Sequence, residues 1–208
     1  MTDYAKRERA QFADLLAQVG PDEPTLCEGW TTRDLAAHVV VRERRPDMMA
    51  GMLVPPLRAY AENIRLAKAA QPFPTVIHEI RTPPWWSPLS NPLTDELANG
   101  MELFIHHEDI RRARPGWQPR QLDAGRQKSI WRAAQLTGRL ALRRLGLPVT
   151  VRAEGFGSFT VGDDPQVTVV GTPGELALFL SGRQRAARVQ IDGPADLAER
   201  LRTARLGM

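Results

Sequence analysis

Cysteine is nearly absent from this chain of 208 residues, which has only Cys27. A single cysteine excludes a disulfide within the chain and favours a reducing compartment. Apolar runs are short, and none is long enough to span a bilayer. The first eight residues also lack the apolar core of a signal peptide. We therefore expect a cytoplasmic protein that does not cross a membrane.

Lysine is scarce as well, because three of the 28 basic residues are lysine and the rest are arginine. The net charge of +4 and the pI of about 9.8 could suggest a nucleic-acid partner. However, the arginines are scattered among 24 acidic residues, and only residues 111–120 concentrate positive charge. That segment has no readable nucleic-acid motif. A solvated surface is the favoured interpretation, and we expect no nucleic-acid partner.

The first two-thirds of the chain have the pattern of helices. Hydrophobic periodicity, capping signals and prolines predict helical segments around residues 12–19, 32–45, 57–70, 75–81, 94–113 and 123–145. Thr31 and Asp34 have the spacing of a capping box at the start of the second segment. The stretch 82–92 contains four prolines and cannot be regular helix. Long helices joined by such loops predict an antiparallel bundle of four main helices.

After Gly146 the pattern changes to short alternating segments. Strands are expected at 149–153, 158–161, 166–170 and 188–192, with Gly162–Pro165 as a hairpin turn. Thr172 and Glu175 have capping-box spacing before a helix over 173–180, and a last helix should cover 194–204. The sequence thus predicts a mainly α protein, with a helical bundle over 1–146 and a small α+β domain over 147–208.

Three polar residues on one predicted helix carry most of the functional information. Glu102, His106 and Asp109 are spaced by four and then three residues, so their side chains share one helical stripe. A carboxylate and an imidazole one turn apart can hold one face of a divalent ion, and Asp109 could orient the imidazole. A third ligand must come from elsewhere, and the other candidates are His38, His78, His107 and Cys27. We favour His38, which gives a site of His38, Glu102 and His106.

The spacing alone leaves other interpretations open. Glu-x-x-x-His is common on surface helices, and the stripe could be a hydrogen-bonded network or simply face solvent. His38 lies beside Leu35 and Val39, where a lone histidine is more often a core residue with a hydrogen-bond partner. Spacing alone therefore does not decide between a metal site and these alternatives.

A family resemblance favours the metal site. The segment from Leu26 to His38, LCEGWTTRDLAAH, resembles the opening motif of the mycothiol-dependent maleylpyruvate isomerase family of DinB-like metalloenzymes. Glu102-x-x-x-His106-x-x-Asp109 resembles its second motif, and the resemblance extends through a small C-terminal domain containing Arg183. It implies a DinB-like four-helix bundle, with His38, Glu102 and His106 as ligands of a divalent metal, zinc being the expected ion. It also implies mycothiol as a co-substrate.

Other residues near these motifs have two interpretations each. His107 points about 100° away from His106 on a helix, so packing or a hydrogen bond is favoured over ligation. Cys27 could approach the metal, although a small buried side chain is the more common role. Trp85 and Trp86, with His107, depart from the characterised isomerases, so the substrate of those enzymes is not transferred. The tryptophans could wall a substrate pocket or cap one end of the bundle.

Arg183 is the candidate catalytic residue of the C-terminal region. Its guanidinium could bind a substrate carboxylate through two parallel hydrogen bonds, or it could interact with the C-terminal end of a helix. The leading hypothesis is a mycothiol-dependent metalloenzyme of the isomerase or transferase type, acting on a small organic substrate. The alternative is a non-catalytic protein that binds a metal or ligand. The sequence does not indicate the oligomeric state.

Overall fold

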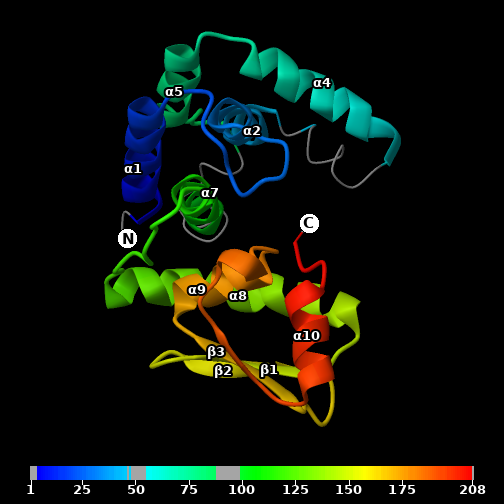
Figure 1. Cartoon of the computed structure of the whole chain (residues 1–208). Helices are drawn as coiled ribbons and strands as arrows, with labels where there is room; N and C mark the ends of the chain where they lie inside the picture. The colour runs from blue at the N-terminus through cyan, green and yellow to red at the C-terminus, as the bar shows by residue number, and fades with distance from the viewer. Residues whose placement is uncertain (1–3, 46, 48–54, 88–98, 208) are drawn as a thin grey trace. The chain divides into compact units, whose positions relative to one another are not determined.

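The structure is a computed structural model that describes residues 4–45, 47, 55–87 and 99–207. The chain forms two compact units, Met1–Trp117 and Gln118–Met208. Each unit is described by itself (Figure 1). No helix among the described residues is long and apolar enough to cross a membrane.

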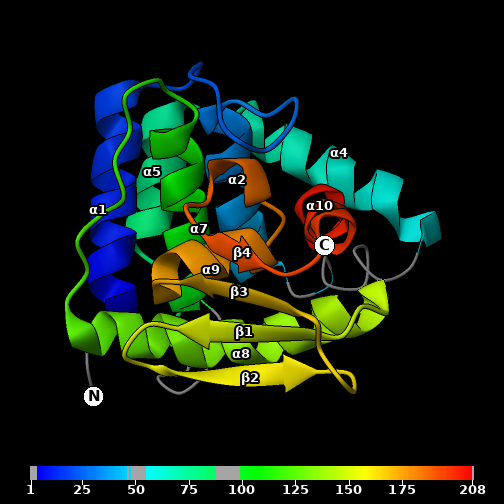
Figure 2. The same cartoon turned by 60° about the horizontal axis from the view of Figure 1, so that its bottom comes forward.

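The first unit is helical. Its helices are α1 (Tyr4–Val19), α2 (Thr32–Arg44), α4 (Arg58–Ala69), α5 (Phe73–Arg81) and α7 (Gly100–Arg112), and a 3-10 turn (Pro55–Leu57) precedes α4. Both α1 and α2 contact α5 and α7, so these four helices close into a bundle, while α4 packs on α2. Figure 2 shows the four bundle helices side by side. The expected four-helix bundle is confirmed.

The bundle core follows from the hydrophobic stripes in the sequence. Phe12 and Leu16 of the first stripe are fully buried, as are Leu35 on α2 and Ile110 on α7. Burying one such side chain contributes about 1.5–3 kcal/mol to folding. The largest fully buried side chains of this core are Phe12, Leu16, Leu35, Ile80, Leu103 and Ile110.

The predicted ends of α2 are confirmed. The backbone N–H of Thr31 donates to Asp34 Oδ2 at 3.0 Å, which completes the capping box, and the helix ends at Arg44, before Pro46. Helix α5 begins two residues earlier than expected, because Pro74 fits the first turn of a helix. The expected start of the motif helix at Thr94 lies outside the described residues.

The second unit combines a sheet with helices. It consists of α8 (Ala124–Leu145), β1 (Val149–Ala153), β2 (Gly157–Val161), β3 (Val167–Gly171), α9 (Pro173–Leu180), a 3-10 turn (Gln184–Ala186), β4 (Gln190–Asp192) and α10 (Ala195–Thr203). The strand order is β2-β1-β3-β4. Strand β1 is antiparallel to β2 and parallel to β3, and β4 is antiparallel to β3. Helices α8 and α9 pack together and contact the sheet.

Two local predictions in this unit are wrong. Gly162–Pro165 is not a hairpin turn, because it joins β2 to β3 and these strands lie on opposite sides of β1. The hairpin is the β1–β2 turn, where Phe156 N–H donates to the Ala153 carbonyl at 3.0 Å. Glu175 does not form a capping box with Thr172; its Oε2 accepts a hydrogen bond from the Arg188 backbone N–H at 2.7 Å.

The division into units differs from the expected domain boundary between residues 146 and 147. That boundary follows the change from helical to strand-like sequence, whereas the contacts of α8 with α9 and β2 group α8 with the second unit. Within the first unit, the short helix α5 completes the four-helix bundle. The two compact units are defined by contacts, whereas a domain is defined by its ability to fold independently. The expected domain boundary therefore stays a prediction.

Candidate metal site

The candidate site lies where α2 meets α7. Helix α2 supplies His38, and α7 supplies Glu102, His106 and Asp109 on one stripe, as the spacing predicts. The loop before α2 supplies Cys27. The structure therefore brings the three expected ligands, His38, Glu102 and His106, into one cluster.

The cluster is centred on one carboxylate oxygen. Glu102 Oε1 lies 3.4 Å from His38 Nε2 and 3.2 Å from His106 Nε2. The two imidazole rings meet edge to face, with centroids 5.2 Å apart and planes at 80°. The side chain of His106 is 7% exposed, whereas those of His38 and Glu102 are 15% and 27% exposed. Solvent therefore reaches the cluster on the side of His38 and Glu102.

Asp109 fixes the orientation of His106. Its Oδ2 lies 2.9 Å from His106 Nδ1, and its side chain is fully buried. A proton on Nδ1 can be donated to this carboxylate, and Nε2 then faces Glu102. A carboxylate behind a ligating imidazole is the usual outer-shell partner in metal sites.

The electrostatics of the cluster favour charge on His106 and Glu102. Burial opposes the ionisation of Glu102, but contacts with His106 and His38 and the nearby charge of Arg42 hold its pKa well below the usual value. Burial also opposes a charged His106, but Asp109, Cys27 and Glu102 raise its pKa well above the usual value. Burial lowers the pKa of His38, and His106 and Arg42 lower it further, against the effect of Glu102.

Sequence reasoning missed three residues around this cluster. Arg42 lies one turn beyond His38; its Nε is 3.6 Å from Glu102 Oε1, and its Nη1 donates to Asn99 Oδ1 at 2.6 Å. Trp30 packs against the His38 ring with centroids 5.3 Å apart. Helical spacing could have identified Arg42 and Asn99, because they lie four and three residues from His38 and Glu102, respectively.

The neighbouring histidines lie apart from the cluster. His107 turns toward α1, where its Nδ1 lies 2.7 Å from the buried Glu8 Oε1 and its ring is near Phe12. This geometry agrees with the hydrogen-bonded interpretation. His78 is exposed on α5. Trp85 and Trp86 are also exposed, by 90% and 50%, so burial at the end of the bundle does not account for Trp85.

Arg183 lies in the second unit, between α9 and the following 3-10 turn. Its Nη1 donates to the backbone carbonyl of Ser181, the residue that caps α9, at 2.6 Å. This contact agrees with the interpretation of Arg183 as an arginine at a helix C-terminus. A role toward a substrate stays a prediction.

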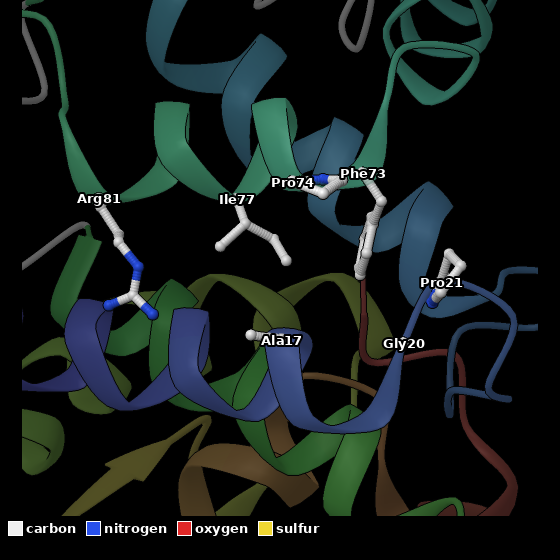
Figure 3. Close-up of a pocket in the computed structure, with 7 residues that line it drawn as sticks. All are labelled: Ala17, Gly20, Pro21, Phe73, Pro74, Ile77 and Arg81. Carbon is white, nitrogen blue, oxygen red and sulfur yellow. The ribbon is translucent and has the colours of Figure 1, made fainter.

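The groove in Figure 3 has a different character. It lies between α1 and α5, and its lining is apolar apart from the guanidinium of Arg81, which pairs with Asp14 at 2.6 Å. None of the candidate ligands lines it. Among the residues that the structure describes, both groups of candidate metal ligands include His106 of α7.

Comparison with known proteins agrees with the motif and the fold. Residues 5–79 match the family model of the mycothiol maleylpyruvate isomerase N-terminal domain. The family resemblance inferred from the sequence is confirmed. The matched segment includes His38 and ends before α7.

A solved structure extends the similarity to the whole chain. It is described as the crystal structure of the mycothiol-dependent maleylpyruvate isomerase, and it matches with a TM-score of 0.64 and 15% sequence identity over 92% of each chain. At this identity the match shows a shared fold. No curated protein sequence matches the chain significantly.

Proposed function

We propose that this protein binds a divalent metal through His38, Glu102 and His106 and acts as a mycothiol-dependent enzyme of the isomerase or transferase type. Its substrate would be a small organic molecule, with carboxylates among the candidates. The metal would be zinc, because two histidines and one glutamate form a ligand set found in catalytic zinc sites. The proposed location is the cytoplasm, in keeping with the single cysteine.

One observation carries the metal assignment: the geometry of acceptor atoms around Glu102 Oε1. When Nδ1 of His106 donates to Asp109, Nε2 can lie this close to the Glu102 carboxylate only if a positive centre lies between the two atoms. That centre is a proton in a charged imidazole or a bound metal ion. The neighbouring nitrogen of His38 approaches the same oxygen.

The spacing of the donors also suits an ion. Nitrogen and oxygen ligands lie about 2.0–2.1 Å from zinc, so a tetrahedral site holds them about 3.4 Å apart. The separations of Glu102 Oε1 from the two imidazole nitrogens are 3.4 and 3.2 Å. These two separations need little change to take up an ion, and all three ligand atoms lie within 4.8 Å of one another.

The chemistry suggested for the site is thiol or water activation. A bound divalent ion lowers the pKa of a coordinated thiol or water and polarises a substrate oxygen. Three protein ligands leave a position open, which is typical of catalytic zinc sites. The partial exposure of His38 and Glu102 would place this position on the solvent side.

The surrounding residues have separate roles in this proposal. Asp109 holds the His106 ring in place, and Glu102 supplies the negative charge that offsets the ion. Arg42 places a positive charge 3.6 Å from Glu102 Oε1, and its hydrogen bond to Asn99 helps to hold it there. We retain Arg183 as the proposed partner of a substrate carboxylate, because its guanidinium can make two parallel hydrogen bonds.

Two measurements on the purified protein test the function. Elemental analysis after extensive dialysis should find about one zinc or similar ion per chain, and mycothiol-dependent turnover should be detectable in an isomerase or transferase assay. Metal retention without turnover or thiol adducts in mass spectrometry would favour the alternative, a non-catalytic metal-binding protein. A protein that binds no divalent ion at micromolar free metal would refute the metal site.

A further inference from the structure

His106 faces a second set of metal-ligating atoms on the opposite side of its ring. Asp109 Oδ2, which lies 2.9 Å from His106 Nδ1, also accepts a hydrogen bond from Cys27 Sγ at 3.3 Å. The sulfur, the Nδ1 nitrogen and the carboxylate oxygen all lie within 4.8 Å of one another. Each nitrogen of one imidazole is therefore directed at a different group of ligand atoms.

The backbone holds Cys27 in this position. The Leu26 N–H donates to the carbonyl of Asp109 at 3.0 Å, which ties the loop directly to α7. Thr25 Oγ1 accepts from the Cys27 N–H at 3.2 Å and donates to the Trp30 carbonyl at 2.9 Å. Cys27 as a residue is half-buried, and these backbone contacts set its position.

The charges of this second set favour a divalent cation. A Cys27 thiolate and the Asp109 carboxylate would together balance an ion of charge +2, whereas the first set contributes only the charge of Glu102. Sulfur is also a soft ligand that selects thiophilic ions over manganese or magnesium. Asp109 is fully buried, where an ion would stabilise its charge.

We propose that Cys27, His106 Nδ1 and Asp109 form a second site, selective for thiophilic divalent ions, that competes with the first site for His106. Starting from a charged imidazole, binding releases the thiol proton of Cys27 and the Nδ1 proton of His106 to solvent. The Nε2 proton stays and is donated to Glu102 Oε1, 3.2 Å away. The first site then lacks one ligand, and two ions on one ring would also repel each other. The competition rests on the proposed function; binding at the second site does not.

Cadmium titration of the metal-free protein tests the second site. We expect a sulfur-to-cadmium charge-transfer band that saturates at one equivalent, and alkylation of Cys27 by iodoacetamide that cadmium blocks and manganese does not. Asp109→Asn should weaken the cadmium affinity at least about tenfold. The urea-unfolded chain, which keeps the thiol but loses the cluster, should bind more weakly still. A band of unchanged affinity in the unfolded chain would mean that the thiol binds alone, and the proposal would be wrong.

A pair of variants separates the two sites. His38→Ala should lose metal from the first site yet keep the cadmium band within about threefold, because His38 is no ligand of the second site. Cys27→Ser should lose the band and keep metal at the first site. If His38→Ala weakens the band as much as Asp109→Asn does, the second site is refuted. Absence of metal at the first site in both wild type and Cys27→Ser, with the cadmium band intact in the wild type, refutes the proposed function instead.

The wild-type protein provides a test that does not depend on the folding of variants. The two ring nitrogens of a labelled histidine have distinct nitrogen-15 resonances, and metal coordination shifts the one that binds. With one equivalent of cadmium we expect the Nδ1 resonance of His106 to shift while Nε2 stays protonated. A shift confined to Nε2 would overturn the proposal.

Discussion

Replacing either of two adjacent buried histidines by alanine should separate ligation from packing. His106 and His107 are 6% exposed each, and each lies within 3 Å of a buried carboxylate, Asp109 at 2.9 Å and Glu8 at 2.7 Å. Each substitution removes one imidazole from α7 and, with it, one imidazole–carboxylate contact to a buried acidic residue. They are therefore matched in their expected cost to folding, about 1–3 kcal/mol each.

The two variants should differ strongly in metal affinity. Loss of an outer-shell residue alone typically weakens metal binding by about 10- to 100-fold, so loss of the ligand His106 should cost at least about 100-fold, or about 2.7 kcal/mol. The metal affinity of His107→Ala should stay within about threefold of the wild-type value. His107 faces Glu8 on α1 and not the metal cluster, so its loss should have little effect on metal binding.

Competition with a chromogenic chelator gives both affinities, and elemental analysis after dialysis gives the metal content. Circular dichroism and urea unfolding would check that the two variants lose similar stability. Equal metal affinities for His106→Ala and His107→Ala, with both proteins folded, would contradict the assignment of His106 as a ligand.

Further predictions follow from other features of the structure. His38→Ala should lower metal affinity as strongly as His106→Ala, measured by the same chelator competition, and normal binding would mean that the third ligand is wrong. Asp34→Asn should destabilise the protein by about 1 kcal/mol in urea unfolding, because it breaks the capping box. Burial opposes the ionisation of Asp34, but Arg65 and Thr31 keep its pKa below the usual value, so its contribution should be present near neutral pH and disappear as the pH falls through and below about 4. Arg183→Lys should lower turnover with a carboxylate substrate while leaving metal content unchanged, and unchanged turnover would make Arg183 a structural residue. Limited proteolysis should cut within residues 114–122, between the compact units, before it cuts near residue 147; the reverse order would support the domain boundary expected from the sequence.

Helical periodicity predicted most of the first unit and the site stripe. Leu35 and Val39 are buried while His38 is partly exposed toward α7, because a helix phase is fixed by the residues that it must bury. The Glu102, His106 and Asp109 stripe follows from the same geometry. These features depend only on residues within one helical turn or on one apolar face. They can therefore be predicted from the sequence alone.

The features that sequence reasoning missed depend on long-range pairing. The strand order could not be predicted from loop length. A connection as long as residues 162–166 can join two adjacent strands, or it can pass across an intervening strand, as it does from β2 past β1 to β3. Glu175 has capping-box spacing, but the backbone of Arg188 competes for its carboxylate. The contact of Cys27 with Asp109 spans 82 positions and is set by the docking of a loop, which has no periodic signal.

The meeting of α2 and α7 has a mechanical consequence for the bundle. Among the four neighbouring helix pairs of the bundle, this pair has the least extensive contact, and it is the pair that carries the candidate ligands. An ion held by His38 and Glu102 would act as a cross-link between points 64 residues apart. Such a clamp joins the two helices only in the folded protein, because its ligands come together only there. The melting temperature of the bundle would then depend on the concentration of free metal, and the seam between α2 and α7 would be the first to open when a chelator is added.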